Sequence, residues 1–340
     1  MAHNPKLEVF VISLNPTTER DVTFRDFYRT KFSIKDSVDD ENLFSEYFKQ
    51  FISAVDSEDF FEDEKNHKAF TAYDTRKDKN NPLNNTIRRY SKSHIIEGIV
   101  EGGRYGQTRN TANLSNKNKK GKLGTRDIVL DQFYFLLFTP LNNDKGIFML
   151  QSYTEDSIRD VFSNFLKPFF SAKGFYNIKI DIYTPKQYVD EFKNKSVLKG
   201  ITYTKNLLVG HIGEQNEEDI EEFTIRIEVK PPKKIEKNTN TVSLGKIKNW
   251  IEKFNPLTFK DNKLEDFSKR IYLGNAQTDK AAYYDLEKDL DSIKPTIYLE
   301  NRIIIDNNGI PDFAELKKYS LELLDTLKNE ISVINRVNEC

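Results

Sequence analysis

The sequence predicts an α+β fold, with mixed, mainly antiparallel sheets and flanking helices. Short runs rich in β-branched and aromatic residues, several alternating with polar residues, are typical of strands. Longer segments carry apolar residues three and four positions apart, as amphipathic helices do. Turn signals such as Asn-Pro, Pro-Pro and Asn-Asn-Gly separate the two kinds of segment. With 340 residues, the chain is long enough for two ordinary domains.

The N-terminal segments suit a strand followed by helices. Leu7–Leu14 predicts a strand, and Phe24 begins a helical pattern. Residues 36–64 contain eleven carboxylates against one lysine, with apolar residues at helical spacing among them. This segment predicts an amphipathic helix with an acidic, solvated face. A sharper interpretation is that the acidic face repels or mimics nucleic acid, or neutralises the basic segment after it.

The centre of the chain predicts the core of the sheet. His94–Gly103 and Phe133–Phe138 are apolar runs, and the second is continuous enough for a strand buried on both faces. Gly146–Gln151 is the expected neighbouring strand. Gly102 and Gly103 indicate a strand end or bulge where another part of the backbone approaches closely.

A strongly basic segment interrupts these strands. From Lys65 to Arg126 there are fifteen Lys and Arg residues against four Asp and Glu, and no acid lies between Gly103 and Arg126. Its Gly, Asn, Thr and Ser content predicts a mobile, hairpin-like extension, and such a basic loop can bind phosphates. An exposed loop without a ligand is the plain alternative. The candidate nucleic-acid-binding residues are Arg88, Arg89, Arg104, Arg109, Lys117, Lys119, Lys120, Lys122 and Arg126.

The remaining segments predict a second mixed half. Thr154 is the expected cap of a helix that Lys173-Gly174 ends, and Pro311 begins a long last helix with an apolar stripe that fits either the core or the seam of a homodimer. We therefore expect a β-rich domain over residues 1–174 and an α+β domain over 175–340. The other predicted strands are 176–183, 201–204, 207–212, 222–230, 270–273 and 296–305, and the other helices begin at 185 and 247.

One pattern suggests catalysis. Glu228-Val229-Lys230 on an alternating strand has the Glu-x-Lys spacing of metal-dependent nucleases, and Asp219 or Asp181 could supply the second carboxylate. In such a site two acids hold Mg²⁺, the only cofactor that we consider, and the lysine polarises the attack. Arg226 beside Glu228 fits an ordinary ladder of surface charges, and this is the interpretation that we expect.

Other site types find little support. The four histidines have no metal-ligand spacing, and the single cysteine, Cys340, has no partner for a disulfide or a metal site. No apolar run is long enough to span a membrane, and the N-terminus lacks the apolar region of a secretory signal. The sequence thus predicts a cytoplasmic protein without a metal centre.

Three segments carry a resemblance. Ile96–Gly106, Phe133–Pro140 and Lys145–Gln151 resemble a pattern in uncharacterised bacterial proteins found near phage-defence genes. The resemblance covers roughly residues 94–170. It implies a role in bacterial antiviral defence and favours contact with nucleic acid.

The expectation is therefore a nucleic-acid-binding protein of bacterial antiviral defence. The alternatives are the metal-dependent nuclease and a dimeric interaction protein that senses a phage protein or another partner.

Overall fold

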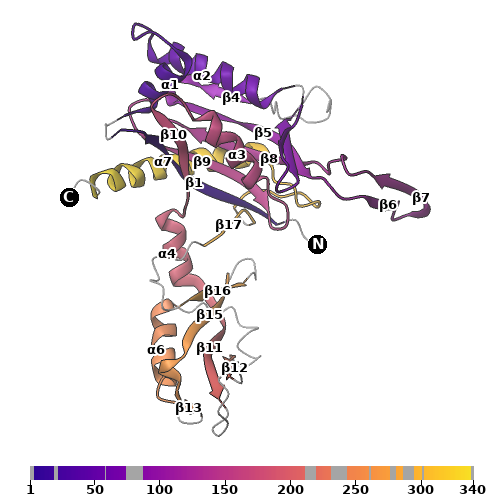
Figure 1. Cartoon of the computed structure of the whole chain (residues 1–340), viewed down its shortest axis with the longest axis vertical. Helices are drawn as coiled ribbons and strands as arrows, with labels where there is room; N and C mark the ends of the chain where they lie inside the picture. The colour runs from indigo at the N-terminus through magenta and orange to yellow at the C-terminus, as the bar shows by residue number, and fades with distance from the viewer. Residues whose placement is uncertain are drawn as a thin grey trace. The chain divides into compact units, whose positions relative to one another are not determined.

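The computed structural model describes residues 4–18, 22–57, 59–73, 87–210, 220–230, 243–259, 262–275, 281–285, 295–300 and 302–337 (Figure 1). Its antiparallel sheets and flanking helices confirm the predicted α+β class. The chain divides into two compact units. Unit 1 comprises Met1–Tyr183 with Thr296–Cys340, and unit 2 comprises Thr184–Pro295.

Unit 1 is built on a nine-stranded antiparallel sheet. The order is β10-β1-β9-β8-β5-β3-β2, with β17 also paired to β1 and β4 to β5. The predicted central strand is confirmed, because β8 lies between β5 and β9 and its middle is buried. The strands are β1 Pro5–Pro16, β2 Phe61–Asp63, β3 Lys68–Ala72, β4 Arg88–Tyr90, β5 Ile95–Arg104, β8 Asp131–Phe138, β9 Lys145–Tyr153, β10 Phe175–Tyr183 and β17 Ile297–Tyr298.

Three helices share a core with one face of this sheet. They are α1 (Phe24–Phe32), α2 (Asp40–Val55) and α3 (Arg159–Phe169). The predicted acidic helix is α2, which buries Tyr47 and Phe51 in this largely aromatic core. Thr23 caps α1 by accepting a hydrogen bond from the Asp26 amide, in a reciprocal capping box.

The last helix covers the opposite face. α7 (Phe313–Val337) contacts β8 and β9, and its Leu316, Leu323, Leu324 and Leu327 are buried. Phe133 and Phe135 belong to the first core, so Tyr134 between them points toward α7. The described part of the stripe is therefore core within one chain. The side chains of Ile331 and Ile334, which complete the predicted stripe, lie outside the described part.

A buried ion pair joins α7 to the sheet. Glu97 on β5 is 4% exposed, and its Oε1 lies 2.7 Å from Nζ of Lys317 on α7. The same carboxylate oxygen accepts a 2.8 Å hydrogen bond from the Tyr90 hydroxyl, and the Lys317 ammonium also donates to that hydroxyl. The hydroxyls of Tyr134 and Ser320 are buried beside Glu97. The helix is thus positioned by a polar cluster as well as by apolar packing.

Unit 2 has its own small sheet and core. The antiparallel order is β12-β11-β15-β16, and Tyr203, Ile251 and Ile271 lie in the core beneath it. Its helices and strands are α4 Lys186–Lys195, β11 Ser196–Gly210, β12 Ile220–Val229, α6 Leu244–Phe254, β13 Thr258–Phe259, β14 Asn262–Lys263, β15 Ser268–Asn275 and β16 Ala281–Asp285.

Several predicted boundaries are wrong. The division does not fall at residues 174/175, because β10 pairs with β1 and α7 covers β8 and β9, so both belong to unit 1. Thr154 caps no helix; its hydroxyl donates to the Asn4 carbonyl, and α3 begins at Arg159.

Three strand predictions also need correction. The predicted strands 201–204 and 207–212 merge, as far as Gly210, into one long β11, because its neighbour β12 pairs with it continuously. Residues 211 and 212 lie outside the described residues. The predicted strand 296–305 is reduced to the two residues of β17. The short strands β2 and β3 were not predicted, since three to five residues give too little periodicity.

The ion pair yields a stability prediction. Lys317→Met leaves the Glu97 carboxylate buried without its cation, so unit 1 should lose about 3 kcal/mol. The double variant Glu97→Gln/Lys317→Met should recover part of that loss. Urea unfolding followed by circular dichroism measures it, while fluorescence of Trp250, the only tryptophan, reports unit 2.

Lys49→Met is the matched control, because the Lys49–Glu46 pair is exposed on α2 and should change stability by less than about 0.5 kcal/mol. Equal effects of Lys317→Met and Lys49→Met would contradict a structural role for the buried pair.

Candidate nucleic-acid interface

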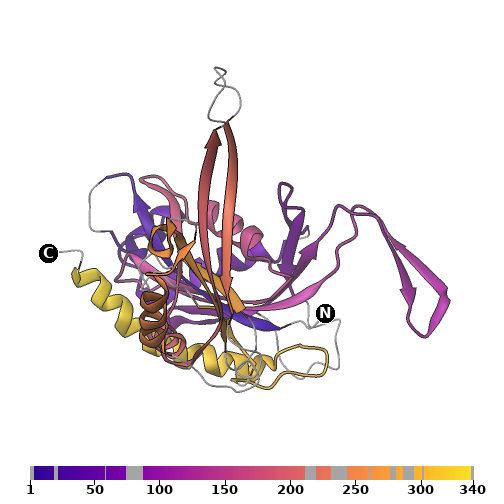
Figure 2. The ribbon, with the colours of Figure 1, turned by 90° about the horizontal axis from the view of Figure 1, so that it is seen from below.

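Residues 109–123 of the basic segment fold as a hairpin that projects from the sheet of unit 1, as both views show (Figures 1 and 2). Residues 74–86 of that segment lie outside the described residues. β6 (Arg109–Asn113) pairs with β7 (Asn116–Leu123), and every residue of both strands is exposed except the half-buried Leu123. Two strands without a core beneath them are only marginally stable. The hairpin therefore adds little to the fold, and its composition is free to suit a ligand.

Cations lie on both faces and at the tip of the hairpin. Lys120 and Lys122 share one face, since they pair with Ala112 and Asn110, whereas Arg109 points to the other face. Lys117 and Lys119 lie where the pairing register jumps near the turn. Within the described residues, none of these five cations forms an ion pair with a carboxylate of α2, whose Asp40 and Glu46 pair with Arg25 and Lys49.

Close packing fixes the root of the hairpin. A Cβ at Gly103 would lie 1.8 Å from the Val129 carbonyl oxygen, and one at Gly102 would lie 2.6 Å from the Ala69 oxygen. The predicted close approach at these two glycines is therefore confirmed. Gly106 has φ +93°, and its amide donates to the Thr125 carbonyl at 2.8 Å, which closes the hairpin's base.

The turn between β2 and β3 is held against the same root. Asp63 is buried and accepts hydrogen bonds from the Asn66 amide (3.2 Å), the Asn66 side chain (2.7 Å) and the Asn164 side chain (2.8 Å). Burial alone would raise the pKa of Asp63, but these hydrogen bonds bring it below its ordinary value. The Tyr105 amide then donates to the His67 carbonyl at 3.0 Å, which joins the turn to the end of β5.

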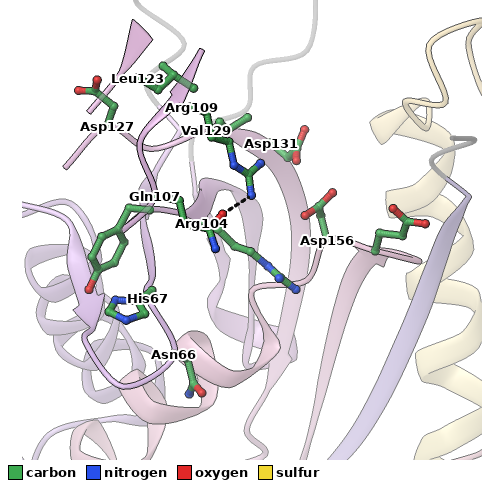
Figure 3. A pocket seen from close by; sticks show the side chains of 12 residues that line it. Asn66, His67, Arg104, Gln107, Arg109, Leu123, Asp127, Val129, Asp131 and Asp156 are labelled. Carbon is green, nitrogen blue, oxygen red and sulfur yellow. Dashed lines mark hydrogen bonds between the residues drawn. The ribbon is translucent and has the colours of Figure 1, made fainter. Parts of the chain in front are cut away.

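A cavity of about 610 Å³ lies at this root (Figure 3). Figure 3 shows the Arg104 and Arg109 side chains between His67 on one side and Asp131 and Asp156 on the other. The lining comes from four places in the chain that the sheet brings together. The lining residues are Asn66, His67, Arg104, Tyr105, Gln107, Arg109, Leu123, Asp127, Val129, Asp131, Glu155 and Asp156.

Two aromatic rings form one wall of the cavity. The His67 and Tyr105 ring centroids lie 5.5 Å apart with the rings nearly perpendicular. The Glu62 carboxylate beside the Tyr105 hydroxyl raises the pKa of Tyr105 to about 12. The phenol therefore stays neutral at physiological pH and does not repel an anion.

The structure separates the sequence-predicted residues into two groups. Arg104, Arg109, the four lysines and Arg126 belong to the hairpin or its base. Arg88 and Arg89 lie instead on β4, opposite Glu97 and Ile96. That is seven residues from Arg104 along β5, or about 23 Å. The Arg89 guanidinium lies 5.4 Å from the centroid of the Phe48 ring on α2.

The nuclease candidates do not gather in one described cluster. Glu228 is exposed on β12, and its carboxylate lies 2.9 Å from both Arg226 and Lys230, as in a ladder of surface charges. Hydrogen bonding to Lys230 lowers the pKa of Glu228. Asp181 is exposed on β10 in unit 1, and Asp219 lies outside the described residues. Among the described residues, no group of three or more His, Cys, Asp or Glu side chains could hold a metal ion.

Sequence reasoning missed most of the cavity wall. Gln107, Asp127, Val129, Asp131, Glu155 and Asp156 gave no motif, because they meet only through the pairing of β5 with β8 and β8 with β9.

No protein family, curated protein or solved structure matches this chain. No helix in the part that the structure describes is long and apolar enough to cross a membrane.

The close packing at Gly103 can be tested by mutation. Gly103→Ala should destabilise unit 1 by about 1–3 kcal/mol, because the added methyl group collides with the Val129 backbone. Gly124→Ala is the control, since a Cβ there meets only ordinary contacts at 3.5 Å or more. Urea unfolding compares the free energies of unfolding of the two variants. If Gly103→Ala left that free energy unchanged, the backbone at the hairpin root would accommodate the added methyl group without cost.

The Glu228 ladder gives a second test. Glu228→Gln and Lys230→Ala should act as surface substitutions and change stability by less than about 0.5 kcal/mol. We expect neither variant to alter any plasmid or RNA cleavage measured with Mg²⁺ or Mn²⁺. Cleavage by the wild type that Glu228→Gln abolishes would reinstate the nuclease.

Proposed function

We propose that this chain is a cytoplasmic nucleic-acid-binding protein of bacterial antiviral defence, and that the β6–β7 hairpin contacts the phosphates. The observation that carries the proposal is the hairpin's uncompensated charge. Arg109, Lys117, Lys119, Lys120 and Lys122 are exposed on an element with no carboxylate between its root and its end. Association with defence rests on the resemblance of residues 94–170 alone.

The shape of the hairpin suits a groove of a duplex. A two-stranded β-ribbon fits the major groove of B-DNA. Cations on both faces of the ribbon can approach the phosphates on both sides of such a groove, and each neutralised phosphate releases condensed counterions. Exposed amides on Asn110, Asn113, Asn116 and Asn118 offer hydrogen bonds to base edges.

The dimeric sensor has less support. Its proposed seam was the apolar stripe of α7, yet Leu316, Leu323, Leu324 and Leu327 are buried within one chain. A homodimer or a partner protein would therefore need a surface other than these four leucines.

The test is the salt dependence of binding. Fluorescence anisotropy with a labelled 20-base-pair duplex should give an affinity that falls with salt, with a log–log slope of about −0.9 per phosphate neutralised. Changing Lys117, Lys119, Lys120 and Lys122 together to Ala should reduce that slope by roughly 3–4 units and leave the melting temperature unchanged.

The control replaces four exposed lysines of unit 2, Lys246, Lys248, Lys253 and Lys263, with Ala. The proposal fails if wild type shows no binding at low salt, or if both quadruple variants weaken it equally.

A further inference from the structure

The cavity at the hairpin root is lined by two arginines, Arg104 and Arg109, and by four carboxylates, Asp127, Asp131, Glu155 and Asp156. The Arg109 guanidinium donates a 2.9 Å hydrogen bond to the Gln107 side-chain oxygen, drawn as the dashed line in Figure 3. Neither it nor Arg104 forms an ion pair within the described part of the chain. A guanidinium presents its donors in a planar fork that matches a phosphate, so this pair can hold one.

The walls around the arginines suit the rest of a nucleotide. The His67 and Tyr105 rings and the half-exposed side chain of Val129 offer flat or apolar surface to a base. Base–aromatic stacking is tolerant of sequence, because every base has a π-face. On the other side, the Asp156 carboxylate can accept hydrogen bonds from exocyclic amino groups or sugar hydroxyls.

The size of the cavity is compatible with a single base. A cavity of about 610 Å³ is within the range of about 300–1,000 Å³ that small-molecule sites occupy. A base inside a duplex is stacked on both sides, so it reaches a concave site only after it is unpaired.

We propose that this root cavity binds one unpaired nucleotide of the strand whose phosphates the hairpin holds, with its phosphate on Arg104 and Arg109 and its base against His67 and Tyr105. This inference rests on the proposed function, since the hairpin delivers the strand. The preferred ligand is then a duplex with a single-stranded overhang rather than a blunt duplex.

The left-handed backbone conformation of His67 allows a substitution that removes its ring without straining the chain. His67 and His94 both have left-handed backbones, with φ 50° and 54°, which asparagine tolerates well. His67→Asn removes the ring from the cavity. His94→Asn makes the same change at the opposite end of β5, next to Phe44, and is the matched control.

The experiment compares labelled blunt duplexes with duplexes that carry a three-nucleotide overhang, in DNA and RNA versions, by anisotropy. Wild type should prefer the overhang about tenfold, in line with one stacked base. His67→Asn should lose most of this preference and keep its affinity for the blunt duplex, whereas His94→Asn should behave as wild type. Arg104→Gln should weaken overhang binding more than blunt binding.

The outcomes separate the two proposals. If nothing binds, the proposed function fails. If blunt and overhang duplexes bind equally in both chemistries, or if His67→Asn retains the preference, the hairpin function stands and the root cavity is not a nucleotide site. An overhang whose three positions are abasic keeps the phosphates for Arg104 and Arg109 but has no base, so it should lose the part of the preference that His67→Asn also removes. This distinguishes base capture from added backbone charge.

Discussion

The arrangement of unit 1 depends on the pairing of β1 on both of its edges. β9 occupies one edge, and β10 followed by β17 occupies the other. Tyr183 at the end of β10 pairs with Val9, and Ile297 of β17 pairs with Leu7, so the two attachment points are about 7 Å apart along β1. Unit 2 is therefore an insertion with adjacent ends, which a sheet can accept without breaking its own pairing.

Charged side chains are in opposite environments at the two ends of β5. At the start, Glu97 is buried and neutralised by Lys317 from a helix more than two hundred residues later in the chain. At the other end, Gly102 and Gly103 let neighbouring backbone pack closely. The chain then leaves the sheet as a hairpin whose cations form no ion pair with any residue that the structure describes. The buried pair stabilises one arrangement of helix and sheet. The exposed cations form no such buried pair among the described residues and contribute little to folding.

The local sequence predicted most of the helices and strands, but few of the contacts between elements that lie far apart in the chain. The apolar spacing identified α2 and the stripe of α7, and the glycines with basic residues identified the hairpin. The cavity escaped prediction because its walls depend on strand register over long separations. Arg88 and Arg89 were grouped with the hairpin for the same reason: nearness in sequence concealed the length of β5 between them. The predicted boundary between the two units was wrong, because no local sequence pattern shows that β10 and β17 both pair with β1.

The near-zero net charge of the chain does not weigh against phosphate binding. Charges beyond a Debye length of about 8 Å are largely screened at physiological ionic strength. The eight residues of β7 span about 26 Å, so the lysines near the tip are screened from the acidic surface of the body. A phosphate near the tip would interact with the local positive potential of the hairpin. The carboxylates at the root would act only on the part of a strand that reaches the cavity. In the proposed function, the two regions would therefore select for different properties: charge density at the tip, and an accessible base at the root.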